Sequence, residues 1–139
     1  MRNVTQDLLI VTNNPKVGEK LSQFQQETCE GYEDVLKAVR NRVHSGAKLI
    51  THPLAGSVKP GESPYRSVAI DISGSGLDMK SLEIIESALE RYTIMVNAKT
   101  YKRNYPEQTL QDFQVIDGQL LLSGLSSIQG VGTLPAAMA

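Results

Sequence analysis

The sequence predicts an α/β fold, in which a small, mostly parallel sheet of three to four strands is layered with about four helices in a Rossmann-like sandwich. Short apolar runs, typical of strands buried on both faces, alternate with longer segments of helical periodicity. The chain has 139 residues, of which 40% are hydrophobic, so one ordinary core can form. We expect a single α/β domain over residues 1–128 and a loosely ordered tail over 129–139.

The N-terminal part predicts a strand followed by a helix. The apolar run at 7–12 is the strand, and Asn14 follows it as an N-cap with Pro15 at the first helical position. The helix is then expected over 15–24. Residues 25–31 are ambiguous and can hold a short edge strand.

The middle of the chain alternates again between helix and strand. Apolar residues at helical spacing predict a helix over 32–45, and Gly46 stands where a left-handed residue ends such a helix. Strands are expected over 47–51 and 67–72. Because the segment between them is not helical, the second strand is expected to run antiparallel to the first, at the sheet edge.

The last third of the chain predicts two helices. Asp78 is an N-cap, and an apolar stripe predicts a helix over 79–96. A further periodic run, which includes Leu110, Phe113 and Ile116, predicts a helix from about 107 to the 120s. Residues 118–123 stay open between helix and strand, since glycines interrupt this run.

Composition excludes several classes of protein. Net charge is −1, which gives little attraction to nucleic acid. Cys29 is the only cysteine and there are two histidines, so neither a disulfide within the chain nor a metal site is predicted, and no cofactor is expected. The first apolar run, LLIV, is too short for a membrane span, and we expect a cytoplasmic protein.

One connection, the 52–66 loop (HPLAGSVKPGESPYR), is unusually long and contains three prolines. Long loops without secondary structure are often functional, and prolines give this one a fixed shape. If the strands before it and before Asn13 are parallel, both loops open at one sheet edge, where ligands of α/β proteins bind. We therefore predict a site for a small anionic ligand or a partner, lined by Asn13, Asn14, His52, Ser57, Lys59 and Arg66.

Three functions are compatible with this pattern. The first is a non-catalytic accessory or ligand-binding protein, because no catalytic set can be recognised. The second is a small enzyme that acts on an anionic metabolite, with His52 as acid or base, since a histidine titrates near neutral pH. The third is a homodimer, with the 52–66 loop or the apolar run 120–122 at its interface.

Three segments carry a resemblance to a known family. They are LLIVTNNPKV at the first strand, DVLKAVRNRVHSGAKL along the second helix, and THPLAGSVKPGESPYRSV across the long loop. These segments resemble the GrdX family, small bacterial proteins whose genes accompany those of glycine, sarcosine and betaine reductase. The similarity runs from about Leu8 to Val96, with DFQVID at 112–117 in addition. It implies an accessory role beside a reductase component, with no established activity, no cofactor and no catalytic residue.

Overall fold

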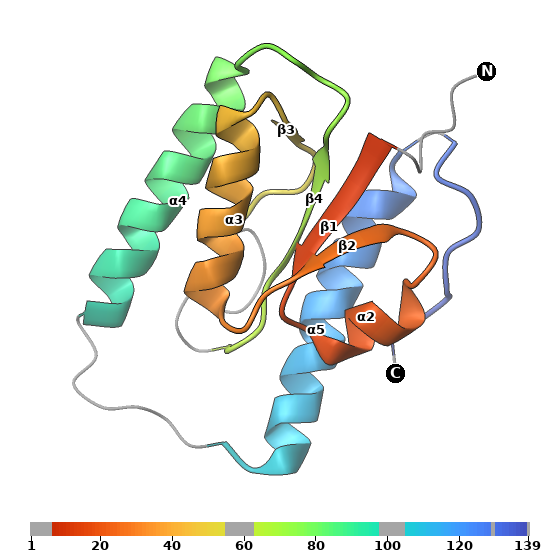
Figure 1. Ribbon diagram of the computed structural model, residues 1–139. Helices are drawn as coiled ribbons and strands as arrows, with labels where there is room; N and C mark the ends of the chain where they lie inside the picture. The colour runs from red at the N-terminus through yellow and green to blue at the C-terminus, as the bar shows by residue number, and fades with distance from the viewer. Residues whose placement is uncertain (1–6, 55–62, 98–104, 129, 139) are drawn as a thin grey trace.

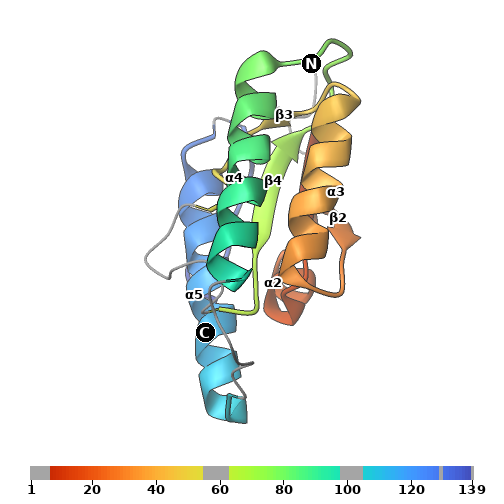
Figure 2. The same cartoon turned by 90° about the vertical axis from the view of Figure 1, so that its left-hand side faces the viewer.

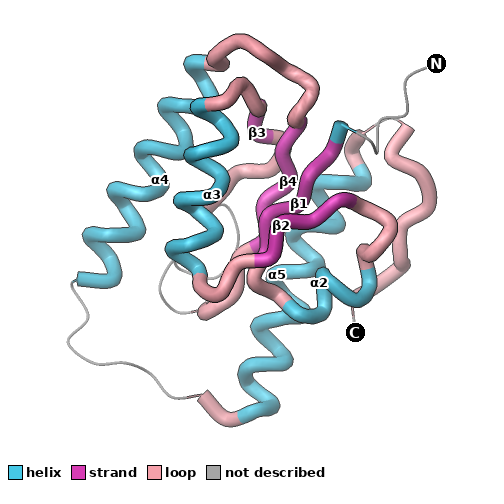
Figure 3. Tube along the Cα trace, in the orientation of Figure 1, coloured by secondary structure: helices cyan, strands magenta, loops and turns pink. Residues whose placement is uncertain are grey.

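A computed structural model describes residues 7–54, 63–97, 105–128 and 130–138. The elements alternate along the chain as expected for an α/β fold (Figure 1, Figure 3). In order they are β1 (Leu8–Thr12), α2 (Pro15–Lys20), β2 (Gln25–Thr28), α3 (Tyr32–His44), β3 (Lys48–Leu49), β4 (Ser67–Asp71), α4 (Met79–Asn97) and α5 (Glu107–Ser126).

The sheet is mixed, with strand order β2-β1-β4-β3. Only β1 and β2 pair in parallel, whereas β4 is antiparallel to both β1 and β3. The prediction of a mostly parallel sheet was therefore wrong, although the antiparallel direction of 67–72 against 47–51 is confirmed. Strand β4 also lies between β1 and β3 rather than at the edge. Its apolar residues are buried on both faces, which suits an interior strand.

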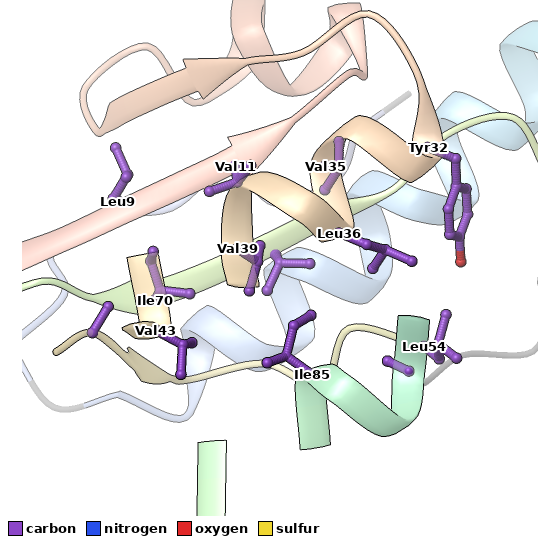
Figure 4. Close-up of a cluster of buried hydrophobic side chains, with 13 residues drawn as sticks. Leu9, Val11, Tyr32, Val35, Leu36, Val39, Val43, Leu54, Ile70 and Ile85 are labelled. Atoms are coloured by element: carbon purple, nitrogen blue, oxygen red, sulfur yellow. The ribbon is translucent and has the colours of Figure 1, made fainter. Parts of the chain in front are cut away.

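Helices cover both faces of the sheet, so the layered arrangement is confirmed (Figure 2). Alternation along β1 sends Leu9 and Val11 to one face and Leu8 and Ile10 to the other. Helices α3 and α4 pack on the first face, where the buried side chains of Figure 4 lie. Helices α2 and α5 pack on the second face around Leu8 and Ile10.

Two helices differ in extent from the prediction. Helix α2 ends at Lys20 instead of residue 24, and the chain then turns so that β2 can pair beside β1. Helix α5 continues through residues 118–123, so these form helix rather than strand. Its buried stripe includes Asp117, Leu121 and Leu125. Ile116, predicted on the apolar face, is 36% exposed.

The segment after α5 packs back onto the second core. Val131 and Met138 are buried there, and the Met138 N–H donates to Gln119 Oε1 at 2.6 Å. A Cβ on Gly118 would come within 2.6 Å of the Met138 side chain, so this glycine makes room for it. The apolar run 120–122 is largely used in the same core, since Leu121 and Leu122 are buried.

A buried carboxylate fastens α5 to the sheet and to α2. Asp117, only 4% exposed, accepts hydrogen bonds from the Ser67 N–H at 3.0 Å and the Ser67 hydroxyl at 2.7 Å. It also accepts one from the Asn14 side-chain amide at 3.0 Å. Ser67 Oγ lies 2.7 Å from Thr12 Oγ1, which joins β1 to the cluster. We call Thr12, Asn14, Ser67 and Asp117 the polar cluster.

Removing this carboxylate should be costly. We expect Asp117→Ala to lower the free energy of unfolding by about 2–4 kcal/mol, because it leaves buried hydrogen-bond donors without an acceptor and creates a cavity. Asp112→Ala, on the exposed side of α5, is the matched control and should cost less than about 0.5 kcal/mol. Urea unfolding followed by circular dichroism measures both. Equal losses in the two variants would contradict a special role for Asp117.

The turn after α3 depends on Gly46. Its φ is +109°, and a Cβ there would lie 2.7 Å from the Gly74 carbonyl oxygen. We expect Gly46→Ala to destabilise the fold by about 2 kcal/mol, through backbone strain and this contact. Gly76→Ala, where a Cβ would meet nothing within 4 Å, should change stability by under about 0.5 kcal/mol. Thermal unfolding of the pair tests the difference.

Candidate functional site

The two loops that the sequence pattern selects meet at one edge of the sheet. Since β1 and β3 are both antiparallel to β4, their carboxyl ends lie at the edge where β4 begins. Asn13 joins the loops directly. Its amide donates to the Pro64 carbonyl at 2.8 Å, and its Oδ1 accepts from the Arg66 N–H at 2.9 Å. The side chain of Asn13 thus has a structural task at this edge.

Asn14 is also used within the fold. Its Oδ1 accepts from the Lys16 N–H at 3.0 Å, which makes it the N-cap of α2. Its amide donates to the Gln114 carbonyl at 2.8 Å and to Asp117, and the residue is only 2% exposed. The N-cap prediction for Asn14 is confirmed. These bonds leave it little capacity for a ligand in this conformation.

Arg66 is a charged side chain held almost entirely inside the protein. It is 4% exposed, and its Nε donates to the Tyr32 hydroxyl at 3.0 Å. The guanidinium carbon also lies 5.4 Å from the centre of the Tyr32 ring, within the range of a cation–π interaction. Tyr92 of α4 stacks on Tyr32, with ring centres 4.8 Å apart. Tyr32 and Tyr92 thus place the guanidinium between the sheet edge and the helices of the first face.

The pKa of Tyr32 reflects this charged environment. Burial raises it above the ordinary tyrosine value, and the positive charge and hydrogen bond of Arg66 oppose that rise. The negative charge of Asp117 raises it further by a smaller amount. Tyr32 therefore stays a neutral phenol beside the guanidinium, able to accept its hydrogen bond.

His52 is more exposed than Arg66 and lies on the same edge. Its Nδ1 accepts a hydrogen bond from the Leu54 N–H at 3.0 Å, so the ring proton is on Nε2. Partial burial lowers the pKa of His52, and the positive charges of Arg91 and Arg66 lower it further. The neutral form, with a donor at Nε2, is therefore favoured at neutral pH.

Two hollows flank His52. One, of about 290 Å³, lies between the sheet edge and α5, and Arg66, Ser67 and Leu121 are among its lining residues. The other, of about 330 Å³, lies between Leu54 and α4 and contains Arg91 and Glu83. Both are near the lower limit of about 300 Å³ for small-molecule sites. We call the first the α5 hollow and the second the α4 hollow.

Of the predicted site residues, His52 and Arg66 line the α5 hollow together. Asn13 and Asn14 use their side-chain amides in hydrogen bonds that hold neighbouring segments together at this end of the sheet. Ser57 and Lys59 lie outside the described residues. Sequence reasoning missed Asp117 and Tyr32 as residues that shape the site. For Asp117 the available signal was a carboxylate four residues before Leu121, at a spacing that shares a helical face.

The described part of the chain contains no group of three or more His, Cys, Asp or Glu side chains placed to hold a metal ion. In the same residues, none of the helices has the length and apolar character needed to cross a membrane.

The comparisons with known proteins identify one relationship. A family model described as GrdX-like protein matches residues 9–126, which is most of the chain. No curated protein and no solved structure matches the sequence. The matched range includes both loops at the sheet edge and the helix that carries Asp117. The resemblance read from the sequence is therefore confirmed, and the chain belongs to the GrdX-like protein family.

Proposed function

We propose that this protein is a non-catalytic accessory protein that binds a small anion, or an anionic group of a partner, in the α5 hollow. The observation that carries the proposal is that Arg66 and His52 both line this hollow, and that none of its described lining residues is acidic. The charge of Arg66, which is close enough to His52 to lower its pKa, supplies a positive potential beside the hollow, and the His52 Nε2–H supplies a directed donor. Thr51 and Ser127 add hydroxyl groups to the same wall.

Burial makes the charge of Arg66 effective. A charge held in a poorly hydrated place interacts more strongly with an incoming anion than an exposed one does. The planar guanidinium also matches the two oxygens of a carboxylate or phosphate. Because Arg66 is only 4% exposed, the anion must be small or must present its charge at the end of a narrow group.

The hydrogen bonding of His52 favours binding over proton transfer. Its Nδ1 lone pair is occupied by the Leu54 N–H, and its Nε2 already carries a proton. A general base needs a free lone pair directed at the substrate, which this tautomer does not provide. The enzymatic alternative predicts turnover that His52→Ala abolishes. The accessory role predicts that neither the unchanged protein nor His52→Ala turns over a substrate.

The family provides the setting for the proposal. We propose that the protein works in the cytoplasm beside a component of an amino-acid reductase system, as the resemblance implies. Glycine, sarcosine and betaine, to whose reductases the resemblance points, each carry a carboxylate, which a guanidinium and an imidazole N–H recognise. The α5 hollow would then take a metabolite or an anionic group of the reductase component.

Anion binding should depend on Arg66 and not on Arg91. With inorganic phosphate and glycine as probes, we expect the amide resonances of Thr51 and Ser67 to shift on titration of labelled protein. Arg66→Gln should raise the dissociation constant at least about tenfold, since a hydrogen bond to a charged group contributes about 1.5–3 kcal/mol. Arg91→Gln removes the same charge beside His52 but in the α4 hollow, and should change affinity less than about threefold.

Because Arg66 also supports the fold, a second variant keeps this test decisive. Ser127→Glu places a carboxylate at the exposed rim of the α5 hollow without touching Arg66. It should weaken phosphate binding through charge repulsion while the circular dichroism spectrum stays unchanged. Loss of binding in Arg91→Gln alone, or full binding in Ser127→Glu, would contradict the α5 hollow as the site.

The protonation of His52 should affect stability as the pH changes and should respond to a bound ligand. Its lowered pKa means that the folded state resists protonation, so stability present above the ordinary pKa of 6.5 is lost as pH falls through the folded pKa. His52→Gln should therefore reduce the loss of unfolding free energy between pH 7 and 5. Bound phosphate should raise the His52 pKa in an NMR titration. The ring resonances of His44, which faces Glu86 across the α3–α4 surface, serve as control. An unmoved His52 titration would count against its contact with the anion.

A further inference from the structure

The two edge strands of the sheet, β3 and β2, differ in how readily a further strand could pair with them. Strand β3 forms one edge with two residues, Lys48 and Leu49, and Lys48 is exposed. A very short strand and a lysine both discourage further pairing. Strand β2 forms the other edge with four residues, QQET, which include neither lysine nor proline. Among the described residues, no strand pairs with the outer side of β2.

The backbone of β2 presents hydrogen-bonding groups on that outer side. The Cys29 N–H, directly after the strand, donates to the Thr12 carbonyl of β1 at 2.8 Å. Because successive peptide groups of an extended chain point to opposite sides, the N–H groups of Gln26 and Thr28 point away from β1. Thr28 is an exposed residue, so this part of the outer side of β2 is open to solvent.

A groove runs beside this edge. It has a volume of about 660 Å³, and its walls are residues 27–30 on one side and α3 on the other. The helix contributes Asp34, Ala38 and Arg42, which recur at helical spacing along one face. A strand edge next to a helix is the arrangement in which PDZ and PTB domains take up an extended peptide as an added strand.

Charge indicates what kind of chain would fit. Within the groove, Glu27 is paired with Arg42 at 3.1 Å, and Lys37 is paired with Glu33 at 3.3 Å. Glu30 and Asp34 have no ion pair within the described residues. Burial raises the pKa of the Cys29 thiol, and the charges of Glu27 and Asp34 raise it further, so these carboxylates lie close to one thiol. The end of the groove near Glu30 is therefore acidic.

The same charges disfavour a second copy of this chain as the occupant. If β2 paired with β2 of another copy, the carboxylates of both copies would be brought to one interface. Like charges that face each other across paired strands are destabilising. A chain that carries Lys or Arg would instead meet complementary charge.

We propose that the groove between β2 and α3 binds an extended segment of another protein, which adds a strand to β2 and places a Lys or Arg side chain against Glu30 and Asp34. This partner site is separate from the α5 hollow, so either proposal can fail without the other.

Peptide selection with the full chain as bait tests the proposal. We expect a displayed library of random decapeptides to yield binders that carry Lys or Arg. The dissociation constant of a synthetic selected peptide is then measured by fluorescence anisotropy.

Thr28→Pro should raise this dissociation constant at least tenfold, because proline removes the outward N–H and is tolerated at a strand edge. Glu30→Lys with Asp34→Lys should raise it at least tenfold. Glu90→Lys, an exposed site on α4, should change it less than twofold.

The remaining outcomes contradict the proposal. Failure to select any peptide, or selection of peptides without basic residues, would overturn it. So would affinity that neither groove variant changes. Light scattering is measured in parallel, and a dimer that Thr28→Pro dissociates would assign the edge to a second copy instead. If circular dichroism shows that Thr28→Pro is unfolded, the Glu30→Lys with Asp34→Lys variant decides alone.

Discussion

The buried carboxylate of Asp117 is the interaction on which this structure depends. Its two oxygens accept hydrogen bonds from β4 and from the loop after β1, although it belongs to α5 at the far end of the chain. A carboxylate buried without partners would cost several kcal/mol, so the fold is stable only when Ser67 and Asn14 are in place. Apolar packing alone tolerates sliding of a helix over a sheet, whereas these directed bonds fix one position of α5.

The candidate site follows from this constraint. Ser67, which Asp117 holds, is the first residue of β4, and Arg66 directly precedes it. Fixing Ser67 therefore fixes the backbone of Arg66, and Asn13 fixes it again through the Arg66 N–H. The positive guanidinium and the negative carboxylate both influence the pKa of Tyr32, in opposite directions. The polar cluster is thus the support that holds a buried cation at the sheet edge.

The sequence was informative about elements and much less so about their pairing. Apolar periodicity placed helices 32–45 and 79–96 almost as found, because that signal is local. The position of β4 between β1 and β3 depends on contacts across more than fifty residues, which no local pattern records. Asn13 and Asn14 were chosen as ligand contacts because they are polar and lie at a strand end. The fold uses their amides to join segments, a role that is visible only once Pro64 and Asp117 are placed in space.

The register of the sheet relates the two proposed sites. Thr12 of β1 is paired with Thr28 of β2 on one side and with Ser67 of β4 on the other. The groove between β2 and α3 and the α5 hollow therefore lie at the same end of the sheet, on opposite sides of β1. Thr12 belongs to the polar cluster, whose hydrogen bonds hold it in one arrangement. Coupling between sites requires an element with two arrangements, and a strand fixed in this way does not provide one. Under the two proposals, the anion and the partner are therefore expected to bind independently of each other.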